Sequence, residues 1–118
     1  MGFNKDWLNK NRKRGNPEAH LVLQIIKYLS LKNHYCGKVK TKGSFTKQGA
    51  FILDKYQMTG LPDIFSFSPN GIFYAIECKA GKNILTSTQE IFKQQFHLPP
   101  TRIFISAYSL EDVMKIIK

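Results

Sequence analysis

One tight turn constrains the fold of this chain more than any other feature. Residues 68–71 read Ser-Pro-Asn-Gly, with proline at the second position and glycine at the fourth, which is typical of a β-turn. Runs rich in β-forming residues lie on either side, at 63–67 and 72–79. We therefore expect these two runs to be the strands of an antiparallel hairpin.

The stretch before this hairpin predicts a helix and a further strand. Apolar residues recur at three- and four-residue steps from 17 to about 31, as on the buried side of a helix. Asn16 is suited to cap that helix, and proline follows it at the first helical position. A strand is expected near 35–40, and the glycine-rich stretch up to residue 60 is expected to be a hairpin or a long loop.

The stretch after the hairpin predicts two helices and a strand between them. Residues 87–90, Ser-Thr-Gln-Glu, match a capping box that opens a helix, which must end before Pro99. Residues 102–108 favour a strand, and Ser109 is expected to cap a closing helix. The apolar side of that helix is expected to consist of Leu110, Val113, Met114, Ile116 and Ile117. The order helix, three strands, helix, strand, helix predicts an α/β fold with a mixed sheet flanked by helices.

The charge of the chain is high and uneven. Its 118 residues include 18 Lys and Arg against 8 Asp and Glu, a net charge of +10. We expect a basic arm at 1–16 and a single domain at 17–118. A polyanionic partner is the simplest interpretation, because each phosphate contact releases condensed counterions. The alternative is a soluble protein with a basic tail.

The location of the protein is expected to be intracellular and cytoplasmic. No apolar run approaches the roughly 18 residues needed to cross a bilayer. The basic, polar N-terminus lacks the apolar core of a secretory signal. The two cysteines, Cys36 and Cys78, fit a reducing compartment and cannot make a zinc site alone. A disulfide between them is the less favoured alternative.

Two acidic residues and a lysine on the hairpin predict a shared site. Because strand side chains alternate between faces, Glu77 and Lys79 share one face and the Cys78 side chain takes the apolar one. The hairpin can bring Asp63 close to both. Carboxylate oxygens and the Cys78 carbonyl suit Mg²⁺, which can polarise a phosphoryl oxygen and lower the pKa of bound water. Lys79 can hold the attacking water and offset charge on the phosphate. The alternative is an ordinary surface Glu–Lys pair with Asp63 in a turn.

Two further polar residues have two interpretations each. Glu18 lies on the buried stripe of the first helix, which suits a site role, but an acid in the first turn is also favoured by the helix dipole. Gln89 lies in line with Phe92 and Phe96 and so faces the sheet, or it satisfies a backbone group. The lysines expected to contact the DNA backbone are Lys38, Lys40, Lys42, Lys47 and Lys82. The histidines expected to be ordinary surface or helix-end residues are His20, His34 and His97.

These motifs resemble a known group of nucleases. Residues 60–63, Gly-Leu-Pro-Asp, followed by 77–79, Glu-Cys-Lys, and by Gln89, are similar to the PD-(D/E)XK nuclease superfamily with its restriction-endonuclease-like core. The similarity is greatest to stand-alone virus-type replication-repair nuclease (VRR-NUC) domains, and next to archaeal-type Holliday-junction resolvases. It extends from Glu18 to the final helix, and its order of elements agrees with the order predicted above.

The resemblance implies a role for each matching residue. Asp63 and Glu77 would bind the metal, and Lys79 would assist catalysis. Glu18 would reach the metal through water, and Gln89 would border the site. The resemblance further implies a homodimer, of viral or other origin, that cuts branched DNA such as Holliday junctions, with Mg²⁺ as cofactor and Mn²⁺ as a substitute. Two rival hypotheses are a non-catalytic basic nucleic-acid-binding module and a nuclease that acts on linear duplex or flap DNA.

Overall fold

A four-stranded mixed sheet forms the centre of the molecule. The computed structural model describes residues 16–39, 44–45, 51–52 and 56–118. The strands of the sheet, in spatial order, are β1 (Tyr35–Lys38), β4 (Ile64–Phe67), β5 (Phe73–Cys78) and β6 (Arg102–Ala107). The pairs β1–β4 and β4–β5 are antiparallel, and the pair β5–β6 is parallel. The predicted hairpin is confirmed, with Ser66 opposite Tyr74.

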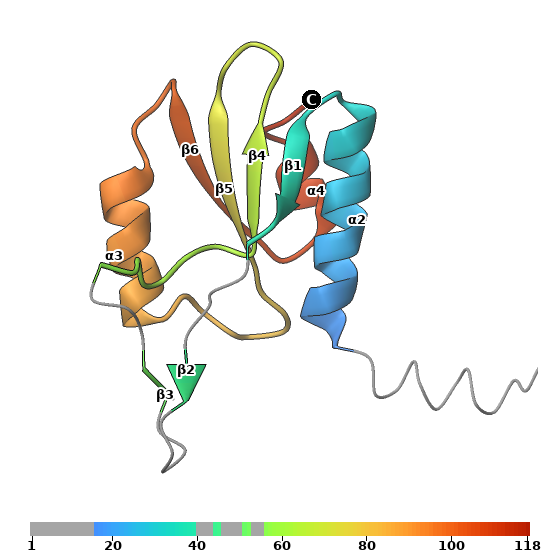
Figure 1. The fold of residues 1–118 in the computed structure, drawn as a ribbon. Coiled ribbons are helices and arrows are strands. Elements are labelled where there is room, and N and C mark those ends of the chain that lie inside the picture. Colours follow the sequence, from blue (N-terminus) through green and yellow to red (C-terminus); the bar gives the residue numbers. More distant parts are fainter. Residues whose placement is uncertain (1–15, 40–43, 46–50, 53–55) are drawn as a thin grey trace, which may run out of the picture.

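Helices cover both faces of this sheet. They are α2 (Pro17–Leu31), α3 (Ser87–Phe96) and α4 (Leu110–Met114). Figure 1 shows α2 and α4 on one face and α3 on the other. The predicted α/β architecture and order of elements are therefore confirmed. The glycine-rich stretch adds a separate antiparallel pair, β2 (Ser44–Phe45) with β3 (Phe51–Ile52). The predicted arm at 1–16 lies outside the described residues except for its last member.

The first helix begins and packs as its sequence predicts. The side chain of Asn16 accepts a hydrogen bond of 2.9 Å from the Glu18 amide, and proline occupies the first turn. Such a cap stabilises a helix by about 1 kcal/mol. The buried residues of α2 are Leu21, Val22, Ile25 and Leu29. They pack with α4 against the same face of the sheet.

Strand β5 alternates as predicted, but both of its faces are buried. Tyr74, Ile76 and Cys78 belong to the larger core beneath α2 and α4. Ala75 belongs to a second core with Phe92 of α3. The face that contains Glu77 is therefore covered by α3 along most of the strand. This buried setting distinguishes Glu77 from an ordinary surface acid.

Two details of the predicted helices are wrong. The cap of α3 is Thr86 and not Ser87, because the extended backbone of Thr86 lets its hydroxyl accept from the Gln89 amide. Of the apolar residues predicted for the closing helix, Met114 and Ile116 are exposed. The helix α4 ends at Met114. Its Val113 and partly buried Leu110 join the core, and so does Ile117 from the segment after it. These three lie three and four residues apart, which is the spacing of one helical face.

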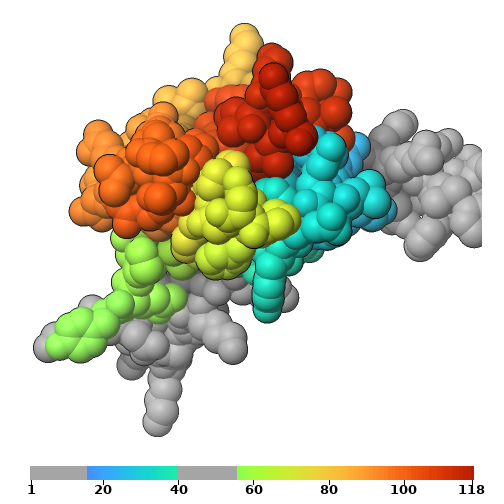
Figure 2. Space-filling view, turned by 90° about the horizontal axis from the view of Figure 1, so that it is seen from above, coloured from blue at the N-terminus to red at the C-terminus, as the bar shows by residue number. Residues whose placement is uncertain are grey.

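The two ends of the sheet differ in what they expose. Figure 2 looks onto one end, where the β4–β5 turn (yellow-green) lies between the end of α3 (orange) and the end of α2 (cyan). At the opposite end, low in Figure 1, lie the start of β4, the end of β5 and the first turns of α2 and α3. All the predicted catalytic residues belong to this second end. Within the described ranges, no helix has the length and apolar character required to cross a membrane.

Candidate active site

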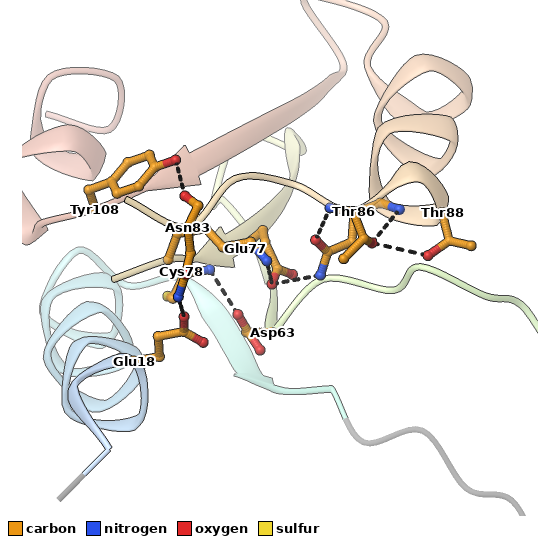
Figure 3. A network of polar contacts seen from close by, with 10 residues as sticks. Glu18, Asp63, Glu77, Cys78, Asn83, Thr86, Thr88 and Tyr108 are labelled. Atoms are coloured by element: carbon orange, nitrogen blue, oxygen red, sulfur yellow. Dashed lines mark hydrogen bonds and ion pairs between the residues drawn. The ribbon is translucent and has the colours of Figure 1, made fainter. Parts of the chain in front are cut away.

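The paired strands bring Asp63 next to the end of β5. The Asp63 amide donates to the Ile76 carbonyl at 3.1 Å, which continues the β4–β5 ladder by one residue. Its carboxylate turns back and accepts from the Cys78 amide at 2.8 Å. Figure 3 shows the Asp63 carboxylate beside the Glu77 side chain. The sequence interpretation that these two acids converge is therefore consistent with the geometry.

Glu77 is buried and has two polar neighbours besides Asp63. The residue is only 5% exposed. The Gln89 amide donates to its Oε1 atom at 3.0 Å, and the Lys79 ammonium lies 3.7 Å from the same oxygen. Lys79 is itself only 8% exposed. One buried ammonium group and one neutral amide donor thus lie against the Glu77 carboxylate.

The surroundings of Glu77 hold its pKa far above the ordinary value. Burial is the largest cause, since it penalises the charged form, and the negative charge of Asp63 is next. A hydrogen bond with the Asp63 side chain and the charge of Glu18 act in the same direction, while the Lys79 ammonium opposes them. Together they raise the pKa of Glu77 to about 7. Two carboxylates this close favour a bound proton or a bound cation.

Gly60 explains the first part of the Gly-Leu-Pro-Asp motif. Its φ angle is +69°, a conformation that glycine adopts without strain. A Cβ atom there would lie 2.3 Å from the Thr88 carbonyl oxygen. The segment that leads to Asp63 can therefore lie directly against the first turn of α3. This close approach keeps Gln89 of α3 within reach of Glu77.

Both interpretations of Gln89 are correct. Its side-chain oxygen accepts from the Thr86 amide at 2.9 Å, which closes the capping box of α3. Its side-chain nitrogen donates to Glu77. The cap therefore orients the amide group that contacts the buried acid. One side chain thus both caps the helix and contacts Glu77.

Glu18 lies at the rim of the same end and has a partner that sequence reasoning missed. Its Oε1 atom accepts from the side-chain amide of Asn83 at 3.4 Å. The Asn83 carbonyl in turn accepts from the Tyr108 hydroxyl at 2.6 Å. Glu18 and Asp63 also line a hollow of about 210 Å³. No short motif could have identified Asn83 and Tyr108, since their contacts join distant parts of the chain.

The predicted DNA-binding lysines are placed unevenly. Lys38, exposed at the end of β1, lines the hollow beside Asp63. Lys82 is exposed in the loop between β5 and α3. Lys40, Lys42 and Lys47 lie outside the described residues. The structure thus gives one predicted lysine a position at the rim of the candidate site and one a position on an adjoining loop.

The donor set fits a hard cation with few protein ligands. Across residues 16–39 and 56–118 and the two short strands, no three His, Cys, Asp or Glu side chains are grouped as a metal site. Asp63 and Glu77 therefore form a two-carboxylate set, which the Cys78 carbonyl could extend. Mg²⁺ suits such a set because it retains several waters. A thiolate ligand does not arise: the Cys78 sulfur is buried in the core, and burial, aided by neighbouring carboxylates, raises its pKa to about 12.

The cysteine thiols and two of the histidines lie outside the candidate site or make contacts within the fold. Cys36 and Cys78 are free thiols, so the less favoured disulfide is absent. His34 follows α2 and its Nδ1 atom lies 2.8 Å from the hydroxyl of Ser66, which is fully buried. Nδ1 of His97, at the end of α3, accepts from the Phe104 amide at 3.0 Å. Both histidines are helix-end residues, as predicted.

Comparison with known proteins identifies a similar fold. No family model and no curated protein matches the sequence. A solved structure described as a VRR_NUC domain matches with a TM-score of 0.61 at 16% sequence identity. The match covers 87% of this chain and 96% of that domain. The chain therefore has the fold of a VRR_NUC domain, in agreement with the fold that the resemblance implied.

Proposed function

We propose that this protein is a divalent-metal-dependent nuclease that hydrolyses phosphodiester bonds of DNA. The observation that supports this most is the convergence of the Asp63 and Glu77 side chains at the end of β5 (Figure 3), where the Lys79 ammonium lies 3.7 Å from Glu77. A pair of acids without a cation is costly at this position, since Glu77 is buried. The VRR_NUC fold provides the same expectation by analogy.

Each residue of the site would have a distinct task in hydrolysis. Mg²⁺ held by Asp63, Glu77 and the Cys78 carbonyl would act as a Lewis acid on the phosphate and lower the pKa of water. Lys79 would hold the attacking water and offset the charge that develops on the phosphoryl oxygens. The new bond would join the water oxygen to phosphorus, and the bond from phosphorus to a sugar oxygen would break. The water would lose one proton, and the leaving oxygen would take one up from solvent, so the protons balance. Gln89 would keep Glu77 oriented.

The substrate and assembly are part of the same proposal. A net charge of +10 favours DNA as the partner, and Lys38 at the rim of the hollow would contact a phosphate. We propose branched DNA, such as a Holliday junction, as the preferred substrate. A homodimer would present two equivalent sites to two equivalent strands. Mn²⁺ would replace Mg²⁺, because both bind oxygen ligands.

The decisive experiment compares DNA substrates and acid variants. Four-way junction, flap and linear duplex DNA are incubated with the protein with and without Mg²⁺, and nicked strands are quantified. The proposal predicts Mg²⁺-dependent nicking, fastest on the junction, which Asp63→Asn and Glu77→Gln reduce by at least about 100-fold. Glu111→Gln, at an exposed position of α4, is the matched control and should cut normally. Normal cutting by both site variants would contradict the assignment.

The rival hypothesis of a non-catalytic DNA-binding module rests on the same net charge. It predicts binding of DNA without nicking under every metal condition, and equal binding by wild type and the acid variants. Faster cutting of linear duplex or flap would favour the other rival. Sedimentation of the free protein tests the dimer separately from the chemistry.

A further inference from the structure

Two consecutive hydrogen bonds join three separate elements around the candidate site. Tyr108, directly after β6, donates through its hydroxyl to the Asn83 carbonyl at 2.6 Å. Asn83, between β5 and α3, donates through its side-chain amide to Glu18 in the first turn of α2 at 3.4 Å. Figure 3 shows this line of contacts next to Asp63 and Glu77. Glu18 is the acid to which it leads.

We propose that Tyr108 and Asn83 are positioning residues that hold Glu18 toward the cation bound by Asp63 and Glu77. The inference rests on the proposed function and deepens it. Glu18 and Asp63 line the same hollow, so the Glu18 carboxylate lies close to the two-acid set. From there it would hold a water of the cation, and the two hydrogen bonds limit its movement.

The loop that contains Asn83 begins with a tight turn that lies beside Tyr108. The backbone amide of Asn83 donates to the Ala80 carbonyl at 3.1 Å, and Gly81 has a φ angle of +59°. Residues 80–83 therefore form a tight turn directly after Lys79. The Lys79 amide donates to the Ala107 carbonyl at 2.9 Å, which places the next residue, Tyr108, beside this turn.

The position of Tyr108 favours a role beyond packing. The residue is 46% exposed, so its hydroxyl could be satisfied by solvent at almost no cost. Its bond to the loop carbonyl is instead short and joins residues 25 positions apart. A bond of this kind contributes about 1 kcal/mol to stability. Its geometric effect, fixing the turn that presents Asn83 to Glu18, is the larger consequence.

The matched control is a second tyrosine with the same kind of bond. The hydroxyl of Tyr28 donates to the Ile117 carbonyl, also at 2.6 Å. That bond joins α2 to the closing segment, at the end of the molecule opposite the site. Tyr28→Phe and Tyr108→Phe therefore each remove one hydroxyl-to-carbonyl bond. Only the second removal affects the contacts of Glu18.

The test measures the response of the protein to Mg²⁺ alone and then cleavage. The melting temperature and calorimetric heats are followed over a Mg²⁺ titration, and junction nicking over the same range. Tyr108→Phe and Asn83→Ala should raise the Mg²⁺ midpoint about three- to tenfold, a modest form of the effect typical of outer-shell residues. Nicking at saturating Mg²⁺ should stay within about twofold. Tyr28→Phe should lower the metal-free melting temperature and leave the midpoint unchanged.

A double variant separates positioning of Glu18 from general support of the loop. Glu18→Gln should raise the midpoint by itself, and adding Tyr108→Phe should then have no further effect. An unchanged midpoint in Tyr108→Phe, or a full additional shift in the double variant, would overturn the inference. Either outcome leaves the proposed function intact, provided that the wild type responds to Mg²⁺ and Asp63→Asn does not. If wild type neither binds Mg²⁺ nor cuts, both proposals are wrong.

Discussion

Glu77 shows how one residue can be unfavourable for folding and suited to chemistry. It is the last residue but one of a strand whose two faces are buried, so its carboxylate has lost most of its water. The protein compensates only in part, with one amide donor and one ammonium group. A buried acid kept next to a second acid is typical of a functional site. Its cost should therefore be measurable in the stability of the metal-free protein.

Glu77→Gln should stabilise the metal-free protein at pH 8 and have almost no effect at pH 4. The folded-state pKa of Glu77 is raised to about 7 from 4.5, so folding favours the protonated acid. That stabilisation is complete below the unfolded pKa and is lost as the pH rises through about 7. At roughly 1.4 kcal/mol per pKa unit, the gain at pH 8 is on the order of 2–3 kcal/mol.

Urea unfolding in EDTA at the two pH values measures this effect. The substituted amide keeps the shape and the contact with Gln89, so packing is unchanged. Mg²⁺ should reverse the order at pH 8, since only the wild type binds it through two carboxylates. A variant that is less stable than wild type at pH 8 in EDTA would contradict the explanation.

At the scale of elements, the site depends on how α3 meets the segment before β4. Gly60 touches the backbone of the first turn of α3, and the capping box of that helix orients Gln89. The hydrogen bond from Gln89 to Glu77 therefore depends on two segments of backbone, the one that contains Gly60 and the first turn of α3. A change that moves them apart should affect catalysis and stability together.

Gly60→Ala should destabilise the protein by about 2–4 kcal/mol and reduce nicking at least tenfold. The new methyl group would approach the Thr88 carbonyl oxygen to 2.3 Å, which forces α3 to move. Gly71→Ala is the matched control, because Gly71 also has a positive φ, of +88°, but no atom within 4 Å of the new Cβ. It should cost only the backbone strain of about 1 kcal/mol. Equal losses for the two variants, measured by urea unfolding, would argue against the contact.

At the scale of the molecule, one end of the sheet contains the candidate active site. The starts of α2, α3 and β4 meet the end of β5 there, while the β4–β5 turn lies at the other end (Figures 1 and 2). The net charge of +10 would attract DNA to the molecule as a whole. Local contacts at the site end would then decide which phosphate enters the hollow beside Asp63.

Lys38→Ala should weaken DNA binding and reduce the salt slope of log K by about one. Lys38 lines the hollow, so its ammonium group is expected to neutralise one phosphate. Lys32→Ala is the control, since Lys32 follows the last residue of α2, at the opposite end from Glu18. Fluorescence anisotropy of labelled junction DNA in Ca²⁺, at several salt concentrations, gives both slopes. Identical slopes for the two variants would remove Lys38 from the proposed interface.

The elements of the fold follow from short-range patterns and could be predicted. The turn at 68–71, the Asn16 cap and the alternation along β5 depend on residues only a few positions apart. The errors were of the same local kind. The cap of α3 lies one residue earlier than predicted, and two apolar residues near the chain's end are exposed, because register and packing at helix ends depend on what the helix meets.

Asp63, Glu77 and Lys79 were predictable as a group because they belong to one hairpin and its immediate end. Their burial, the shift in the pKa of Glu77, and the joining of Asn83 to Glu18 across 65 positions were not. Those properties arise when the parallel β6 places Tyr108 beside the turn after β5 and α3 closes over the sheet. The sequence determines which carboxyl and ammonium groups are available and how far apart they lie along the chain. Their burial and their long-range contacts exist only after distant segments pack together and exclude water.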